Sequence, residues 1–226
     1  MKEVMGTVVL ETLEEIANPK HTAFLVIDIQ NDSASPKGLQ ASNGKDISAA
    51  RKIIPKVKVV LEEARRLGLL VIFMKSVRSK DGICESGPRH RLHARSNAFP
   101  APGAVTCVEG TWGSEVVDEL APKPNERQII KYRSDSFIGT TLDMILRNRD
   151  IKSVVVVGMA TWGCVECTVR TLNLTDYYPV VLSDCVCARE PDLHELSLRL
   201  MSATYADVVS SEELLNVWRS VSVTKV

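Results

Sequence analysis

Short apolar runs alternate with amphipathic stretches along most of the chain, a pattern typical of β-α-β units that build a parallel sheet. The run Val154–Val157 is apolar at every position. A half-exposed strand would alternate apolar and polar residues, so this run favours a central parallel strand covered by helices on both faces. The pattern predicts six strands: Ala23–Asp28, Leu69–Met74, Gln128–Lys131, Ser153–Val157, Pro179–Ser183 and Ala206–Val209.

Helices are predicted between these strands. From Ile53 to Leu67, apolar residues recur at helical spacing, and Gly68 stands where a helix commonly ends. The other predicted helices are Thr140–Asn148, Gly163–Thr175, Asp192–Ser202 and Ser211–Ser220. We therefore predict an α/β fold: a three-layer α/β/α sandwich with a six-stranded, mainly parallel sheet. We expect a single domain over residues 1–226, with an N-terminal extension at 1–21.

Residues 76–106 interrupt this alternation. The segment is rich in proline and glycine and shows no sustained period, so we expect an irregular insertion. It is locally basic, with Arg78, Lys80, Arg89, Arg91, Arg95, His90 and His93 against Asp81 and Glu85. Two interpretations stay open: a solvated loop or subunit contact, and a lid that binds an anion.

Charge and composition exclude several classes of protein. The chain has 226 residues, with 28 Lys+Arg and 28 Asp+Glu, so it lacks the basic excess of a nucleic-acid-binding surface. No apolar run approaches the roughly 18 residues needed to span a bilayer, so we expect no membrane partner. Residues 1–21 lack the continuous apolar stretch of a secretory signal. We therefore expect a cytoplasmic protein whose six cysteines are reduced thiols.

Three side chains with complementary chemistry follow predicted strands. Asp28 ends the first strand, Lys131 ends the third, and Cys164 follows the fourth at the start of a helix. Ligands of open α/β sheets bind beyond the carboxyl ends of the strands, so these side chains are expected at one edge. A helix N-terminus and a nearby ammonium both favour a thiolate. The three residues therefore predict an acid/base partner, a charge stabiliser and a nucleophile.

The same residues lie in three recognisable segments. Residues Gly158–Thr168 match every fixed position of the pattern G-x-x-T-x-x-C-V-x-x-T, and Val26–Asp32 matches V-I-D-x-Q-x-D. Lys131 is followed by Phe137, Thr140 and Leu142, which match K…F…T-x-L. In these segments the chain resembles the isochorismatase-like cysteine hydrolases, over about residues 22–210.

The resemblance implies a catalytic triad of Asp28, Lys131 and Cys164 that cleaves an amide-type C–N bond without a cofactor. It also implies a cis peptide bond between Met159 and Ala160, and an oxyanion hole formed by the amides of Ala160 and Cys164. Members of the family assemble as homo-oligomers, so a dimer or tetramer is expected. The substrate would be a small amide or ureide. The residues expected to contact it are Gln30, Asn31 and Trp162, with Tyr132 and Trp112 as further candidates.

The chain also departs from the family pattern. Ser33 stands where members commonly have Phe, and Trp162 where they commonly have Asn. Nicotinamidases of the family hold a metal through an Asp-x-His after the second strand, and Met74–Arg78 offers neither residue, so no metal is expected. Isochorismatases proper lack the cysteine, so Cys164 argues against their vinyl ether hydrolysis. The segments are most similar to ureidoacrylate amidohydrolases and related ureide-cleaving enzymes.

Three alternatives remain at this stage. The first is a nicotinamidase-like amidase. The second is a redox or zinc-binding protein, because Cys164 and Cys167 form a C-x-x-C pair and Cys185 and Cys187 form a second close pair. The third is a non-catalytic relative of the hydrolases that serves as a binding or scaffold subunit.

Overall fold

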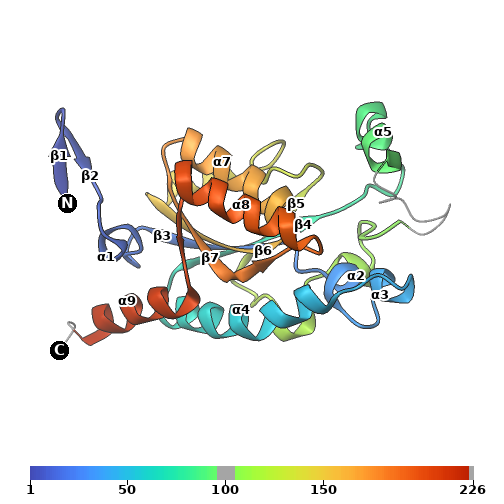
Figure 1. Ribbon diagram of the computed structural model, residues 1–226, viewed down its shortest axis with the longest axis horizontal. Helices are drawn as coiled ribbons and strands as arrows, with labels where there is room; N and C mark the ends of the chain where they lie inside the picture. The colour runs from blue at the N-terminus through green and yellow to red at the C-terminus, as the bar shows by residue number, and fades with distance from the viewer. Residues whose placement is uncertain (96–104, 224–226) are drawn as a thin grey trace.

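A six-stranded sheet forms the centre of the molecule, shown in Figure 1 for the computed structural model. The structure describes residues 1–95 and 105–223, without the side chains of 92–95 and 221–223. The strand order is β5-β4-β3-β6-β7-β8, and all five ladders are parallel. The strands are β3 (Thr22–Ile27), β4 (Leu70–Ser76), β5 (Arg127–Lys131), β6 (Ser153–Met159), β7 (Tyr178–Cys187) and β8 (Asp207–Val209). The predicted parallel sheet is confirmed.

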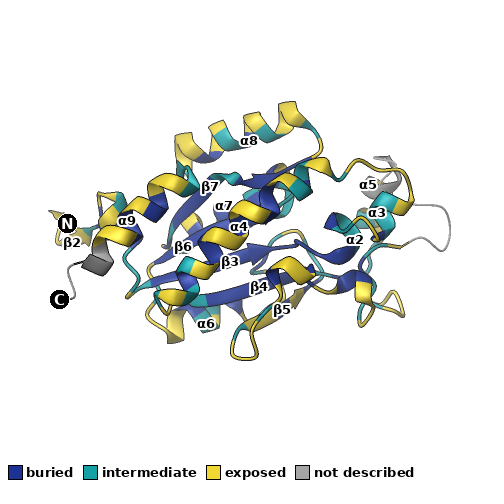
Figure 2. Ribbon diagram, turned by 90° about the horizontal axis from the view of Figure 1, so that it is seen from below, coloured by how far each residue is buried: buried dark blue, intermediate teal, exposed yellow. Residues whose placement is uncertain are grey.

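Helices cover both faces of this sheet (Figure 1). The helices α4 (Ser48–Arg66) and α9 (Ser211–Val223) pack on one face, where Phe24, Val155 and Trp218 share one hydrophobic core. The helices α6 (Leu142–Asn148), α7 (Glu166–Leu174) and α8 (Pro191–Thr204) cover the other face over a second core. Figure 2 shows the strands buried between these layers. The three-layer sandwich is therefore confirmed.

Several elements differ from the sequence prediction. β7 continues four residues past Ser183, so Cys185 and Cys187 lie within the strand. Its register with β6 shifts between Val156 and Gly158. The segment predicted to be irregular contains α5 (Gly87–Arg95). This helix was missed because its sequence, GPRHRLHAR, has no apolar stripe. Residues 96–104 of that segment lie outside the described part of the chain.

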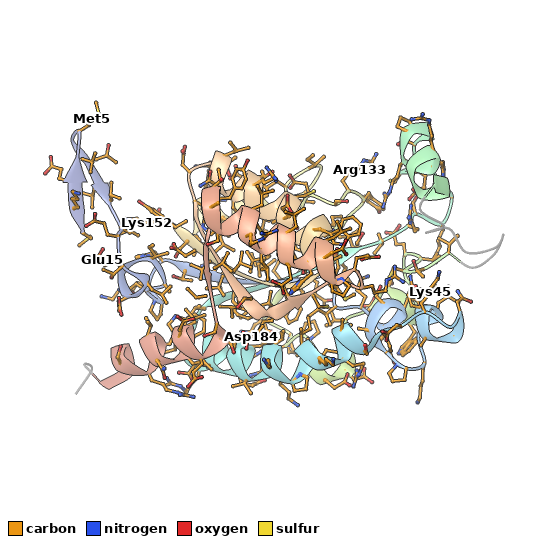
Figure 3. The ribbon with its side chains drawn as sticks, in the orientation of Figure 1. Met5, Glu15, Lys45, Arg133, Lys152 and Asp184 are labelled. Carbon is orange, nitrogen blue, oxygen red and sulfur yellow. The ribbon has the colours of Figure 1, made fainter. Side chains whose placement is uncertain are left out.

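Short elements occupy the predicted extension and the connections. The extension holds a hairpin of β1 (Lys2–Val4) and β2 (Thr7–Val9), which stands away from the sheet in Figure 1, and the one-turn helix α1 (Leu13–Ile16). Met5 at the hairpin tip is labelled in Figure 3. The connections carry α2 (Asn31–Ala34), α3 (Leu39–Ser42) and the 3-10 turns η1 (Trp112–Ser114) and η2 (Asp118–Leu120). Among the described residues, no helix combines the length and apolar character required to cross a bilayer.

The two central strands come very close together at Gly158. Its φ of +130° is a backbone conformation that L side chains rarely adopt, and a Cβ atom at this position would overlap the carbonyl oxygen of Ile27 on β3. Because Ile27 directly precedes Asp28, this close approach lies at the carboxyl ends of β3 and β6, where both strands leave the sheet.

We expect Gly158→Ala to lower the free energy of unfolding by more than about 3 kcal/mol, since it combines steric overlap with an unfavourable φ. Gly44→Ala is the matched control. Gly44 has a φ of +70° but no neighbouring atom within 4 Å of the added Cβ, so its cost should be about 1–2 kcal/mol. Urea denaturation measures the free energy of unfolding of both variants. Equal losses of stability would contradict the close backbone approach at Gly158.

Candidate active site

The carboxyl ends of the parallel strands bring the three predicted side chains together. Asp28 directly follows β3, and Lys131 is the last residue of β5, two strands away across β4. Cys164 lies after β6 in η3 (Thr161–Val165), a short turn with a kink at Gly163 that leads into α7. Asp28 and Lys131 are the electrostatic and hydrogen-bond partners of the Cys164 thiol. The sequence prediction that these residues meet at one sheet edge is confirmed.

A buried ion pair forms the centre of the site. Lys131 Nζ donates to Asp28 Oδ2 at 2.8 Å, and the Lys131 side chain is completely buried. The ammonium also donates to the carbonyls of Arg133 and Ser134, each at 3.2 Å. Burial opposes the charge on Lys131, but the Asp28 carboxylate and the Cys164 thiol outweigh this effect and raise the pKa of Lys131. Lys131 therefore remains a cation.

The Asp28 carboxylate is held in one orientation by the strand beside it. The backbone N–H of Ser76, at the end of β4, donates to Asp28 Oδ1 at 3.0 Å. The residue itself has a φ of +57°, so the chain turns sharply at the point where β3 ends. One carboxylate oxygen therefore contacts the sheet backbone and the other contacts Lys131.

The resting state of Cys164 differs from the sequence prediction. Burial and the negative charge of Asp28 raise the pKa of the Cys164 thiol to about 12, and the opposing effect of Lys131 is smaller. A thiolate favoured by a helix N-terminus and a lysine was expected. The expectation of a thiolate was wrong because the sequence, which did place Asp28 beside Lys131, could not show how far the thiol is desolvated. The resting side chain is a neutral thiol beside a carboxylate that can accept its proton.

The turn that carries Cys164 is held from two sides. The Met159–Ala160 peptide bond before it is cis, as the family resemblance implied. On one side, Thr168 Oγ1 donates to the carbonyl of Cys164 at 2.7 Å and lies 2.9 Å from Ser136 Oγ. On the other side, α8 contacts the turn, with His194 Nδ1 2.8 Å from Thr161 Oγ1. These contacts fix the backbone around the thiol.

Sequence reasoning missed most of these supporting residues. Thr161 and Thr168 are fixed positions of the nucleophile segment, so the motif itself pointed to them. Ser136 and His194 carried no such signal, because each reaches the turn from a segment that is distant in sequence. Glu190 belongs to the same group, since its carboxylate accepts a hydrogen bond from Trp162 Nε1 at 3.0 Å.

The residues predicted to contact substrate differ in how far they are buried. The Gln30 and Asn31 side chains are buried and their amides bond to backbone groups: Gln30 to Ser76 and Ser114, and Asn31 to the carbonyl of Trp112. These bonds give both residues a positioning role, and their contact with substrate stays a prediction. The rings of Trp112 and Trp162 are about half exposed, at 48% and 45%. Tyr132 donates from its hydroxyl to Glu109 at 3.2 Å.

A pocket lies beside Trp162. Ala160 and Trp162 line it together with the α4 residues Ala49 and Ala50, and Ser33 and Glu190 add polar groups. Asp28, Lys131 and Cys164 do not line this pocket, whereas Ala160, whose amide is a predicted oxyanion donor, does.

The state and burial of the cysteines are relevant to the alternative that the protein is a redox or zinc-binding protein. All six are free thiols, and Cys185 and Cys187 are buried within β7, where burial raises the pKa of each to about 12. Cys167 is half-buried on α7. The described residues contain no cluster of three or more His, Cys, Asp or Glu side chains that could hold a metal ion.

Comparison with known proteins identifies the family of the chain. The isochorismatase domain model matches residues 22–213, so the chain belongs to the isochorismatase family. It is 38% identical over 181 residues to the ureidoacrylate amidohydrolase RutB of Caulobacter segnis. The matched region covers 77% of this chain and 76% of that protein. A cysteine hydrolase structure from Pseudomonas syringae superposes with a TM-score of 0.77 at 25% identity, covering 90% of this chain and 94% of that one. The N-carbamoylsarcosine amidase structure from Thermoplasma acidophilum superposes with a TM-score of 0.64 at 28% identity, and the match covers 84% of this chain and 96% of that one.

The raised pKa of Cys164 predicts slow alkylation at neutral pH. The rate with iodoacetamide should rise about tenfold per pH unit up to pH 10 without a plateau, because only the thiolate reacts. Asp28→Asn removes the negative charge that raises this pKa, so the rate at pH 8 should increase by about tenfold or more. Mass spectrometry of the labelled peptides resolves the individual cysteines.

Cys187 is the internal control for this measurement. Its pKa is raised by burial alone, so Asp28→Asn should change its alkylation rate only through a loss of stability, and the rate at Cys164 should rise by more than the rate at Cys187. A Cys164 rate that levels off below pH 9, or one that Asp28→Asn does not change, would contradict a neutral resting thiol.

Proposed function

We propose that the protein is a cysteine-dependent amidohydrolase that cleaves a C–N bond of a small amide or ureide. The observation that carries the proposal is the contact of one thiol, Cys164, with the buried Lys131–Asp28 ion pair. Covalent catalysis requires a nucleophile beside a proton acceptor, and a third group that holds the acceptor in place. The similarity to a ureidoacrylate amidohydrolase and an N-carbamoylsarcosine amidase supports ureides as the substrate class.

In the proposed first half-reaction, Asp28 takes the proton of Cys164 as substrate binds, and the sulfur attacks the carbonyl carbon. The oxyanion accepts hydrogen bonds from the backbone amides of Ala160 and Cys164. As the tetrahedral intermediate collapses, the C–N bond breaks and Asp28 returns the proton to the leaving ammonia or amine. A thioester or thiocarbamate remains on the sulfur.

Water completes the cycle in the second half-reaction. Asp28 accepts a proton from the attacking water, the C–S bond breaks, and the thiol recovers that proton. Lys131 stays protonated throughout, because its raised pKa holds the charge in place. Its role is to stabilise the carboxylate and to fix its position, and no step needs a metal or an organic cofactor.

The proposal predicts that Cys164→Ala lowers turnover by about 10⁴-fold or more, since no other group replaces the nucleophile. The assay is ammonia release from a panel of ureides, N-carbamoyl amino acids, nicotinamide and simple amides, run with and without EDTA. Release from one class by the unmodified protein identifies the substrate type, and nicotinamide as the preferred substrate would favour the nicotinamidase-like alternative.

Cys167→Ala is the matched control, because it removes the other thiol of the C-x-x-C pair. We expect it to retain most of the activity. Turnover that persists in Cys164→Ala would overturn the proposal. Loss of activity in both variants would favour a dithiol, and silence across the whole panel would favour a non-catalytic relative.

A further inference from the structure

A cavity of about 490 Å³ opens at the amino ends of the central strands. The first residues of β3 and β4, Thr22 and Leu70, line it. β4 has seven residues and ends at Ser76, which contacts Asp28. A strand rises about 3.3 Å per residue, so about 20 Å of sheet separates the cavity from the triad. The cavity is large enough for a small ligand and is distinct from the candidate active site.

Cations outnumber anions around this cavity. Glu126 is the one acidic side chain among the described residues that line it, against four basic ones: Lys20, Arg65, Lys123 and Arg149. Like charges around a shared cavity repel one another, and an anionic ligand relieves that repulsion.

Apolar side chains make up much of the remaining lining. They are Pro19, Leu69, Leu70 and Ile151. A cleft that carries one sign of charge beside walls of low polarity concentrates the electric field, so it attracts counter-ions more strongly than an open surface does. The neutral polar residue Asn125 also lines the cavity and offers amide donors to an anion.

The acidic groups beside α4 are already paired. Arg65 Nε and Nη2 donate to the two carboxylate oxygens of Glu126, each at 2.7 Å, and both side chains are nearly buried. Arg65 Nη1 also contacts Glu62 at 2.7 Å, and Lys123 Nζ lies 3.8 Å from the other oxygen of Glu62. Arg65 and Lys123 therefore match these two carboxylates, which leaves neither carboxylate for the other cations of the cavity.

Lys20 and Arg149 have no such partner. Neither side chain forms an ion pair or a hydrogen bond within the part of the chain that the structure describes, and both are exposed to a ligand. Their segments are neighbours, because the N–H of Lys152 donates to the carbonyl of His21 at 2.9 Å. Figure 3 shows Lys152 beside α1. Two unpaired cations on adjacent segments are suited to bind two anionic groups of one ligand.

We propose that this cavity binds a small polyanion, a molecule with two or more closely spaced phosphate or carboxylate groups. Lys20 and Arg149 donate to its anionic groups, and Lys123 adds a third positive charge. The inference does not rest on the proposed function, because the cavity lies at the other end of the strands from Cys164.

A bound polyanion would connect segments that are distant in sequence. Lys20 precedes β3, Arg65 lies in the last turn of α4, and Arg149 directly follows α6. A ligand that binds only the folded protein stabilises it by mass action. The melting temperature should therefore rise with the concentration of the polyanion.

Isothermal titration calorimetry at constant ionic strength tests the site. The probes are tripolyphosphate and citrate, and acetate is the comparison with a single charge. We expect at least one polyanion to bind about tenfold or more tightly than acetate, and the tighter of the two identifies the preferred anionic group. Lys20→Gln and Arg149→Gln should each weaken its binding by about tenfold, since each removes a charged donor.

Lys45→Gln is the matched control, because it removes the same charge from another exposed lysine. Figure 3 shows Lys45 beside α3, at the other end of the molecule from Lys152. This variant should change the affinity by less than about twofold, and Arg149→Lys should keep part of it, since the charge remains.

Thermal unfolding without ligand shows whether each variant is folded. With the polyanion present, the rise in melting temperature should be reduced in Lys20→Gln and Arg149→Gln and preserved in Lys45→Gln. No binding of either polyanion, equal affinity for acetate, or an equal effect of Lys45→Gln would overturn the inference. Failure of the proposed function would show instead as turnover that persists without Cys164, whatever the calorimetry gives.

Discussion

Lys131 loses its contact with water completely on folding, and a buried ammonium needs a compensating charge. Asp28 supplies that charge, and three neighbouring backbone groups complete the arrangement: the N–H of Ser76 donates to Asp28, and the carbonyls of Arg133 and Ser134 accept from Lys131. Removing either partner would leave an unpaired buried charge, at a cost of about 3–5 kcal/mol. The pair therefore connects the ends of β3, β4 and β5 at the edge where Cys164 lies.

The ion pair also determines the chemistry of the thiol. Desolvation is the largest effect that disfavours the thiolate, and the carboxylate next to Cys164 disfavours it more than the ammonium favours it. A resting enzyme with a neutral thiol is protected from oxidation and alkylation at neutral pH. In the mechanism we propose, activation then depends on substrate, because transfer of the proton to Asp28 accompanies attack.

The surroundings of the triad divide into two sides with different character. Towards α8, the turn η3 is held by hydrogen bonds, such as Thr161 with His194 and Trp162 with Glu190. Towards α5, Arg78 pairs with Glu85, and Arg89 donates to the carbonyl of Tyr132. One side thus holds the turn that carries Cys164, and the other carries ion pairs.

Much of the fold was predictable from sequence because its signals are local. The wholly apolar run Val154–Val157 indicated a covered parallel strand, and helical spacing between Ile53 and Leu67 indicated a covering helix. Parallel strands place their carboxyl ends at one edge, so Asp28, Lys131 and Cys164 could be assigned to one site before any coordinates. The helix α5 could not be predicted, because its nine residues lack the apolar stripe that marks a helix in sequence.

The tertiary structure alone determined which charged groups of the site contact one another. Whether Lys131 favours a thiolate depends on the distance to Asp28 and on how far water is excluded, and neither quantity is encoded in a spacing of residues. The roles of Gln30 and Asn31 likewise depended on which backbone groups their amides reach. The contact of Arg89 with the carbonyl of Tyr132 depended on where α5 packs. Local pattern thus determined the elements and their order, whereas burial and long-range contact determined the protonation state and the partners of each functional group.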